Sequence, residues 1–382
     1  NPDGGRRSTI RSVQPDMAGA GLAVPPVELG IGAVLFDHEH VDPEPQQVVQ
    51  GAHVQFAEQP VLNWQVRDER VGFVHRDDGS AAAGLDRQRR GSDNGPVTVA
   101  LLPTGIEICH ESFGDPADPT VLLMHGLGSQ MLVWEEGLCR LLADTGLHVV
   151  RYDHRDSGLS TIFGPEGPPD GPSASGPYDL SDMAFDAVGL LDHLELADAH
   201  VVGFSLGGMV AQTMAVEHPD RCRSLISMGS STGNREFGRP AESTLAAMLV
   251  PSPADPAEAI EKELADRRLW ASVWHDDDHA RAVFADYQRR SLQPQHAYDR
   301  QRGAAIINGD REAALATITV PTRVVHGSAD TLITPAAGER TAAVIPGATF
   351  VLLEGWGHDM APGAWPVIVP AIADHCHAVD SI

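Results

Sequence analysis

The sequence predicts an α/β fold: a mostly parallel, doubly wound sheet with a helical cap inserted between two of its strands. Three observations predict it. From Val97 onward, short apolar strand-like runs alternate with helix-like segments, as in a parallel sheet covered on both faces. The alternation stops between about Ser230 and Asn308, where the pattern is mostly helical, and it resumes at Thr322. The polar motifs follow the strands directly, and ligands of such sheets bind at the carboxyl ends of strands.

Composition limits the class of protein. The chain has 382 residues, 42% of them hydrophobic, and a net charge of −26. It can hold one large domain plus an additional segment, or two domains. The acidic balance argues against nucleic acid as a partner, because phosphate binding needs clustered Lys and Arg. No apolar run reaches the roughly 18 residues of a transmembrane helix, so we expect no stable membrane insertion.

The cysteines and a His/Asp-rich segment raise the question of metal binding. Cys109, Cys139, Cys222 and Cys376 form neither a C-x-x-C pair nor a Cys/His cluster with metal-ligand spacing. We expect free, mostly buried thiols in a reducing, cytoplasmic compartment, and no metal. The segment 275–279, His-Asp-Asp-Asp-His, resembles a metal cluster superficially, but we expect a solvated acidic loop there.

The chain divides into four parts. Residues 1–95 show no sustained helical or strand period, and we predict a poorly ordered N-terminal segment, with an accessory domain or non-native coding sequence as alternatives. Residues 96–230 form the first part of the α/β core, 231–308 the helical cap, and 309–382 the second part of the core.

The elements follow from periodicity and turn residues. Strands are predicted at 97–102, 106–113, 121–124, 148–152, 223–228, 322–326 and 349–354, the first two forming a hairpin. Helices are predicted at 130–145, 180–194, 208–217, 336–344 and 366–377. Residues 164–177, rich in Pro, Gly and Ser, are predicted to be a surface loop. In the cap, Trp270, Trp274 and Phe284 are expected to form its core, or else to line an acyl or alcohol pocket.

The most informative stretch begins at Ala199, where a short apolar strand runs into Gly203-Phe204-Ser205-Leu206-Gly207. An apolar helical segment follows at once. Strand, Gly-x-Ser-x-Gly and helix together are typical of a nucleophile elbow. The glycines leave room for the tight turn, and Ser205 stands at its tip. We therefore predict that Ser205 is a nucleophile.

A serine hydroxyl needs a base, and the base needs an orienting group. After Ser205 the chain offers Asp330 at the end of one strand and His358 at the end of the next. We predict that His358 takes the serine proton and that Asp330 fixes its tautomer. Asp359 is a rival acid, but adjacent residues seldom face each other, so Asp330 is preferred.

An oxyanion hole is expected from two backbone N–H groups. One is that of Leu206, directly after the serine, and the other that of Leu127, after His125-Gly126. Backbone donors do not depend on the side chain, so a leucine can serve at both positions. His125 is expected to hold its loop by hydrogen bonding.

These motifs resemble those of the α/β-hydrolase superfamily from about residue 97 to 380. The matching residues are His125-Gly126, Asp153-x-Arg155, Gly203-x-Ser205-x-Gly207-Gly208, Gly327-x-x-Asp330 and Gly357-His358. More narrowly, residues 151–160 are similar to the stretch in aclacinomycin-methylesterase-like hydrolases and related actinobacterial carboxylesterases. The superfamily commonly has Gly where this chain has Asp156.

The resemblance implies a serine hydrolase that cleaves carboxylic esters, short-chain or methyl esters above all, through an acyl-enzyme and without a cofactor. A C–C bond hydrolase, a lactonase or a perhydrolase of the haloperoxidase type uses the same triad and is the alternative. Serine at the elbow argues against epoxide hydrolases and haloalkane dehalogenases, which carry Asp there. A non-catalytic ligand-binding protein of this fold is the remote alternative. The expected partner is a small-molecule ester, and the sequence leaves the oligomeric state open.

Overall fold

The computed structural model describes residues 89–90, 96–165, 167, 178–250, 255–291 and 293–381. The expectations for most of residues 1–95 and of the loop 164–177 therefore lie outside the described residues. Within residues 1–95, for which we predict a poorly ordered segment, residues 89–90 form a short strand that pairs antiparallel with β2 (Pro96–Leu101).

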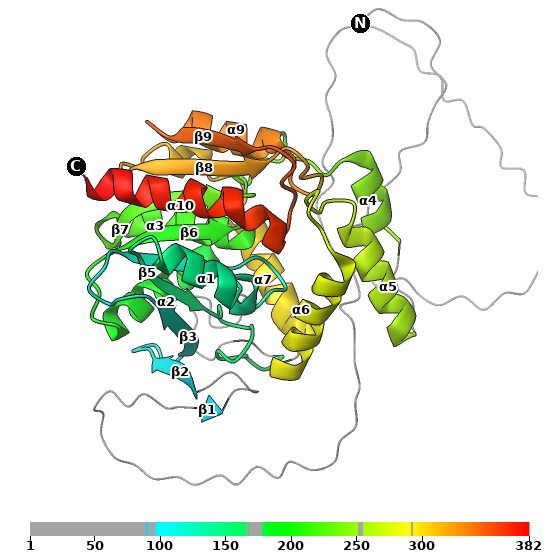
Figure 1. Ribbon diagram of the computed structural model, residues 1–382, viewed down its shortest axis with the longest axis horizontal. Helices are drawn as coiled ribbons and strands as arrows, with labels where there is room; N and C mark the ends of the chain where they lie inside the picture. Colours follow the sequence, from blue (N-terminus) through cyan, green and yellow to red (C-terminus); the bar gives the residue numbers. More distant parts are fainter. Residues whose placement is uncertain are drawn as a thin grey trace, which may run out of the picture. The chain divides into compact units, whose positions relative to one another are not determined.

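The described residues form one nine-stranded sheet (Figure 1) in the order β1-β2-β3-β5-β4-β6-β7-β8-β9. The strands are β1 (Arg89–Arg90), β2 (Pro96–Leu101), β3 (Glu107–Phe113), β4 (Thr120–Met124), β5 (His148–Tyr152), β6 (Ala199–Phe204), β7 (Cys222–Met228), β8 (Thr322–Gly327) and β9 (Thr349–Leu353). From β5 to β9 all neighbours are parallel, whereas β2, β3 and β5 pair antiparallel. The predicted hairpin is thus confirmed, with Thr98 opposite His110.

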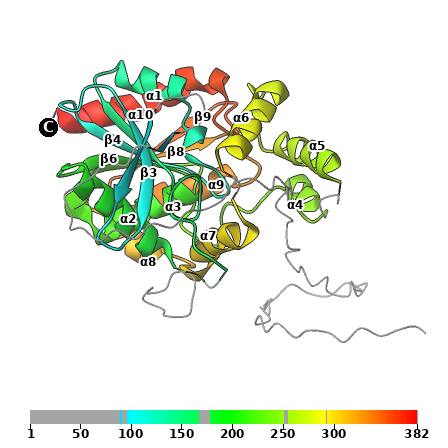
Figure 2. The ribbon, with the colours of Figure 1, turned by 90° about the horizontal axis from the view of Figure 1, so that it is seen from below.

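Helices cover both faces of the sheet (Figures 1 and 2). Helices α1 (Glu136–Ala143) and α10 (Trp365–Asp380) lie on one face, and α2 (Leu180–His193), α3 (Leu206–Glu217) and α9 (Pro335–Val344) on the other. Strand β4 shows why both faces are covered. Its Leu123 packs into the core beneath α1 and α10, whereas Leu122 packs beneath α2 and α3, because successive strand residues point to opposite faces.

Helices α4 (Glu242–Met248), α5 (Pro256–Arg267), α6 (Asp277–Arg290) and α7 (Gln295–Ile307) stand between β7 and β8 in the chain, and α8 (Glu312–Leu315) returns it to the sheet. They contact loops that follow the carboxyl ends of parallel strands. Tyr298 of α7 packs on Gly128 after β4, and Gln301 donates to the carbonyl of Arg155 after β5. The inserted helices therefore cover the edge where ligands of such sheets bind, and the predicted fold class is confirmed.

Two segments differ from their predictions. The helix expected over 130–145 is a 3₁₀ turn at Met131–Val133 followed by α1, because the chain turns at Trp134 (φ −84°, ψ 75°). The indole of Trp134 is fully buried, and the backbone carbonyl of Trp134 accepts a hydrogen bond from the Arg151 guanidinium. The acidic segment 275–279 is not a loop, since Asp276 caps α6 by accepting from the backbone N–H of His279.

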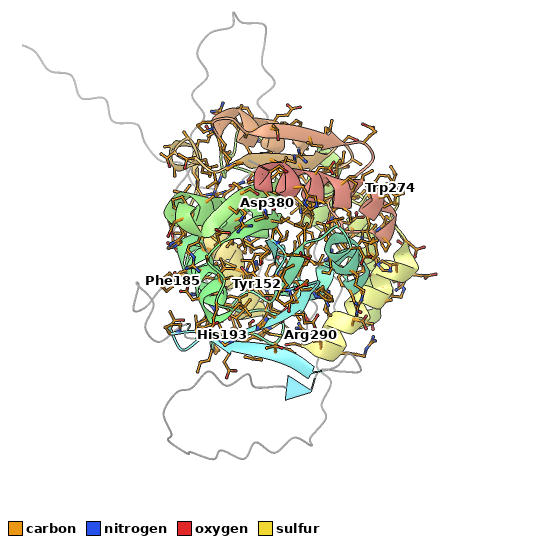
Figure 3. The ribbon with its side chains drawn as sticks, turned by 60° about the vertical axis from the view of Figure 1, so that its left-hand side comes forward. Tyr152, Phe185, His193, Trp274, Arg290 and Asp380 are labelled. Atoms are coloured by element: carbon orange, nitrogen blue, oxygen red, sulfur yellow. The ribbon has the colours of Figure 1, made fainter. Side chains whose placement is uncertain are left out.

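Three further expectations concern the cysteines, the aromatic residues of the cap and membrane insertion. All four cysteines are free and buried, as predicted. Trp274 packs against the core beneath α1 and α10 (Figure 3), so this cap aromatic contributes to the core of the sheet region. In the described part of the chain, no helix combines the length and apolar character needed to cross a membrane.

Candidate active site

Ser205 lies at the turn between β6 and α3 with φ 56° and ψ −118°, a conformation that non-glycine residues rarely adopt. The turn is tight. A Cβ on Gly203 would lie 2.1 Å from the carbonyl oxygen of Gly207, and a Cβ on Gly207 would lie 2.3 Å from that of Met124. The two glycines are therefore required by close backbone approach, and they let Ser205 stand at the tip.

His358 and Asp330 meet Ser205 at this edge of the sheet. The Ser205 Oγ and His358 Nε2 atoms are 3.0 Å apart, and His358 Nδ1 lies 2.7 Å from Asp330 Oδ2. Asp330 is 2% exposed and His358 9%, so water reaches neither freely. The chain thus brings three residues from distant loops into one continuous line of hydrogen bonds.

The environment of Asp330 determines the tautomer of His358. Burial would raise the pKa of the Asp330 carboxyl, but the charge of His358 and hydrogen bonds from His326 and His358 lower it to about 2. The carboxylate is therefore ionised at neutral pH and accepts the Nδ1–H proton of His358. That leaves Nε2 free to accept the Ser205 hydroxyl proton. Asp330 Oδ1 is held by the backbone N–H groups of Leu332 and Ile333, each at 2.9 Å.

His125 orders the loop that contains Leu127. Its Nε2 accepts from the backbone N–H of His154 at 3.1 Å, so Nδ1 carries the proton and donates to the Gly126 carbonyl at 2.8 Å. Burial lowers the pKa of His125 to about 4, which keeps the ring neutral. In a trans peptide the N–H points opposite to the carbonyl, so the N–H of Leu127 points away from His125.

The same loop lies against the serine. A Cβ on Gly126 would be 3.2 Å from the Cβ of Ser205. Leu206 is the first residue of α3, where backbone N–H groups have no partner within the helix. Within the described residues, no hydrogen bond is formed by the N–H of Leu127 or of Leu206. Both N–H groups therefore belong to segments that border Ser205.

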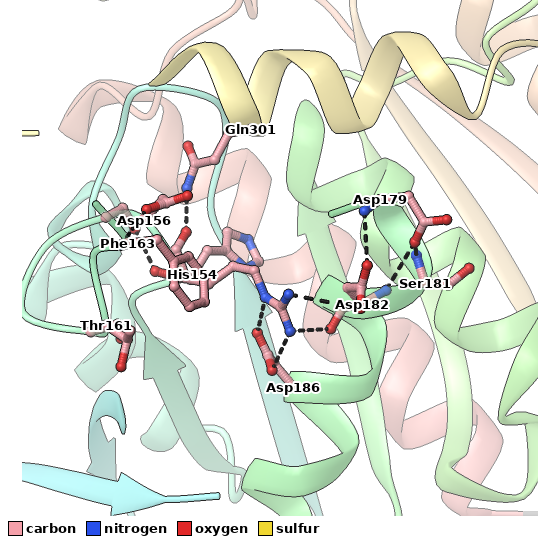
Figure 4. Close-up of polar contacts among 12 residues, drawn as sticks. His154, Asp156, Thr161, Phe163, Asp179, Ser181, Asp182, Asp186 and Gln301 are labelled. Carbon is pink, nitrogen blue, oxygen red and sulfur yellow. Dashed lines mark hydrogen bonds and ion pairs between the residues drawn. The ribbon is translucent and has the colours of Figure 1, made fainter. Parts of the chain in front are cut away.

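The loop after β5 is fixed by buried ion pairs that sequence reasoning missed. Asp186 of α2 accepts two hydrogen bonds from Arg155 at 2.6 and 2.8 Å, and Gln301 of α7 donates to the Arg155 carbonyl (Figure 4). Arg290 of α6, labelled in Figure 3, reaches the fully buried Asp153 at 2.7 Å. In the sequence, an arginine on an amphipathic helix is indistinguishable from a residue of the solvated face. The pairing of Arg290 with Asp153 therefore leaves no sequence signal.

Asp359, the alternative acid of the triad, lies next to the His/Asp-rich segment 275–279. Asp359 accepts from the backbone N–H of Ser272 at 3.0 Å and lies 3.7 Å from His275 Nδ1, while Asp330 pairs with His358. His275 also contacts Asp277 at 3.0 Å. Among the residues the structure describes, no group of three or more His, Cys, Asp or Glu side chains is arranged to hold a metal ion.

Known proteins resemble this chain in sequence and in fold. The family model described as alpha/beta hydrolase fold matches residues 119–361. Rhodomycin D methylesterase DauP of a Streptomyces species is 30% identical over 311 residues, which cover 74% of this chain and 98% of that protein. The methylesterase of the same name, DnrP, from Streptomyces peucetius is 29% identical over 300 residues, covering 72% and 96%. A hydrolase structure from Pseudomonas aeruginosa has a TM-score of 0.56 at 25% identity and covers 74% of this chain and 98% of its own. The resemblance inferred from the motifs is confirmed by these matches.

Proposed function

Because the chain belongs to the alpha/beta hydrolase fold family, we propose that it hydrolyses carboxylic esters of small molecules through an acyl-enzyme on Ser205. The observation that carries this proposal is the line of hydrogen bonds from Ser205 Oγ through His358 to Asp330, at 3.0 and 2.7 Å. These distances allow a proton to pass from the hydroxyl to the imidazole as the nucleophile attacks.

In the first half of the reaction, Ser205 Oγ attacks the ester carbonyl carbon and His358 Nε2 takes its proton. The ionised Asp330 carboxylate stabilises the imidazolium that forms. As the tetrahedral intermediate collapses, His358 returns the proton to the leaving alcohol. In the second half, His358 deprotonates a water molecule that attacks the acyl-enzyme, and the acid is released. When the second tetrahedral intermediate collapses, the bond to Ser205 Oγ breaks and His358 Nε2 returns the water's proton to that oxygen, so both protons pass through the same nitrogen.

The developing oxyanion requires donors that are already in place. We propose the backbone N–H groups of Leu127 and Leu206 for this role. Their support is the His125–Gly126 hydrogen bond, which turns the Leu127 N–H away from the ring, and the position of Leu206 at the start of α3. Loss of one such donor costs on the order of 3 kcal/mol of transition-state stabilisation. The steps use the chain's own residues, and no cofactor is proposed.

Methyl and other short-chain esters are the substrate class we propose. Two relatives at about 30% identity are named methylesterases, and each match covers more than 70% of this chain. The motif around residues 151–160 pointed to the same group of enzymes. A lactonase, a C–C bond hydrolase or a perhydrolase would use the same three residues, so substrates decide among them.

The experiment is a panel of p-nitrophenyl and methyl esters of increasing acyl length, with a lactone and a C–C cleavage substrate included. We expect turnover of short acyl esters, and a loss of several orders of magnitude in Ser205→Ala. Fluorophosphonate is expected to label the wild type at Ser205 and to leave the variant unlabelled. Equal rates for both proteins would exclude Ser205 from the reaction.

Ser224 offers a matched control. Its Oγ lies 2.8 Å from His200 Nδ1, and His200 Nε2 lies 3.2 Å from Asp380, so a second serine, histidine and aspartate are in line. This group stands near the amino ends of β6 and β7, and Ser224 is fully buried. Ser224→Ala should therefore keep its esterase activity and its fluorophosphonate labelling.

A further inference from the structure

One segment of the cap touches both loops that complete the proposed triad. This segment, residues 269–273, is called the strap below. Thr331, next to Asp330, donates from Oγ1 to the strap carbonyl of Leu269 at 2.6 Å. The backbone N–H of His358 donates to the next strap carbonyl, that of Trp270. Two adjacent carbonyls of the strap are thus bonded to the acid loop and to the histidine loop.

The strap follows the histidine loop beyond this point. Val273 donates its N–H to the Gly355 carbonyl at 2.9 Å. A Cβ on Gly357 would lie 2.2 Å from the carbonyl carbon of Ala271, so no side chain fits between the two segments there. The backbone around His358 therefore packs directly on the strap, and a shift of the strap would move the histidine with it.

The side chain of Asp359 fastens the two segments together. Its Oδ2 accepts from the backbone N–H of Ser272 at 3.0 Å and lies 3.3 Å from the Ser272 hydroxyl. The partly buried carboxylate also lies 3.7 Å from Nδ1 of His275, just beyond the strap. A hydrogen bond from a backbone N–H to a carboxylate is stronger than one between neutral groups, so the Asp359 side chain links the histidine loop firmly to the strap.

We propose that Asp359 is a positioning residue: it holds the strap against the histidine loop and thereby keeps the His358 ring between Ser205 and Asp330. The inference rests on the proposed function, because it assigns a role relative to that triad. Small displacements of a reacting group carry large rate costs, and a shift near 1 Å can cost about 100-fold. The contacts of the Asp359 side chain in the described residues are with the strap and its surroundings and not with Ser205, so the proposed effect passes through His358.

The test compares variants that keep or remove the acceptor. Asp359→Asn keeps an oxygen that can accept from Ser272, whereas Asp359→Leu fills the same space without one. We expect Asp359→Leu to lower kcat for a short-chain ester about tenfold or more, with KM within about twofold of wild type. Asp359→Asn should recover most of kcat. The rate of fluorophosphonate labelling at Ser205 should follow kcat in both variants.

Asp276 provides the matched control, since its carboxylate also accepts from a backbone N–H of the cap, that of His279 at 2.8 Å. It does not contact the histidine loop in the described residues. Asp276→Ala should lower the melting temperature while leaving kcat and the labelling rate unchanged. If Asp359→Leu does not give folded protein, Asp359→Ala makes the same comparison with Asp359→Asn.

Two results would overturn the proposal. If Asp359→Leu lowers the melting temperature while kcat and the labelling rate stay at wild-type values, Asp359 only anchors the cap. If KM rises and kcat does not change, it acts on substrate binding. Failure of the proposed function looks different, because Ser205→Ala would then keep its activity. In that case neither claim survives.

Discussion

Asp156 and Arg300 form a two-bond ion pair between the loop after β5 and cap helix α7, with both nitrogen–oxygen distances at 2.8 Å. Asp156 is fully buried and Arg300 is 8% exposed. Asp156 also has φ 63°, a conformation that favours glycine. Asp156, which stands where the superfamily commonly has glycine, therefore has a strained backbone conformation, and its carboxylate bonds the loop after β5 to α7 of the cap.

Removing the cation of this pair should destabilise the protein strongly. Arg300→Met leaves the Asp156 carboxylate buried without its counter-charge, which costs about 3 to 5 kcal/mol in comparable sites. Urea unfolding at neutral pH measures the loss. The double variant Asp156→Gly/Arg300→Met should be more stable than Arg300→Met alone. It leaves no charge of this pair buried, and glycine adopts the positive φ at position 156 without strain. A double variant less stable than both single variants would contradict this account.

The lowered pKa of the buried His125 predicts how the free energy of unfolding depends on pH. Its folded pKa is about 4, against an ordinary value near 6.5, because burial disfavours the charged ring. The unfolded chain therefore binds more protons between these values, so the stabilisation is present above pH 6.5 and is lost as pH falls toward 4. We expect His125 to account for roughly 2 kcal/mol of the loss between pH 7 and pH 5.

The check is to measure urea unfolding of wild type and His125→Gln at both pH values. The variant should be less stable at pH 7, and its stability should fall less than that of wild type on acidification. His154 is buried beside it with its own pKa lowered, so part of the pH dependence remains in the variant. Parallel pH curves for the two proteins would show that His125 does not titrate as expected.

The sequence predicted the sheet, the elbow and the positions of the polar loops, because strands and tight turns leave strong local signals. Ser205 illustrates this, since Gly203 is required by its close contact with the backbone of nearby Gly207, although Gly207 itself is required by the distant Met124. The contacts made by the cap left no such signal. Arg300 meets Asp156 across 144 positions of sequence, and only tertiary packing distinguishes it from a solvated helix residue. Trp134 shows the converse, since the spacing over 130–145 is helical, yet the backbone turns at this buried residue and α1 begins only at Glu136.

The glycine before the elbow should not tolerate a methyl group. A Cβ on Gly203 would stand 2.1 Å from the carbonyl oxygen of Gly207, and neither backbone segment can move without disturbing the turn. We expect Gly203→Ala to lower the free energy of unfolding by about 3 kcal/mol or more, or to prevent folding. Gly303 in α7 is the control, because nothing lies within 4 Å of a Cβ there. Gly303→Ala should stabilise the protein by about 0.5 to 1 kcal/mol.

Asp330→Asn tests which carboxylate orients the histidine. The amide would donate to His358 Nδ1 and so favour the tautomer with its proton on Nε2, which cannot accept from Ser205. We expect kcat for a short-chain ester to fall about 10⁴-fold, with little change in KM. Asp374→Asn, on the exposed side of α10, controls for the change of charge and should leave kcat unchanged. The comparison with Asp359→Asn is decisive, because that variant should keep most of its activity. If the two variants exchanged behaviours, Asp359 would be the orienting acid, and the hydrogen bond between His358 and Asp330 would be structural.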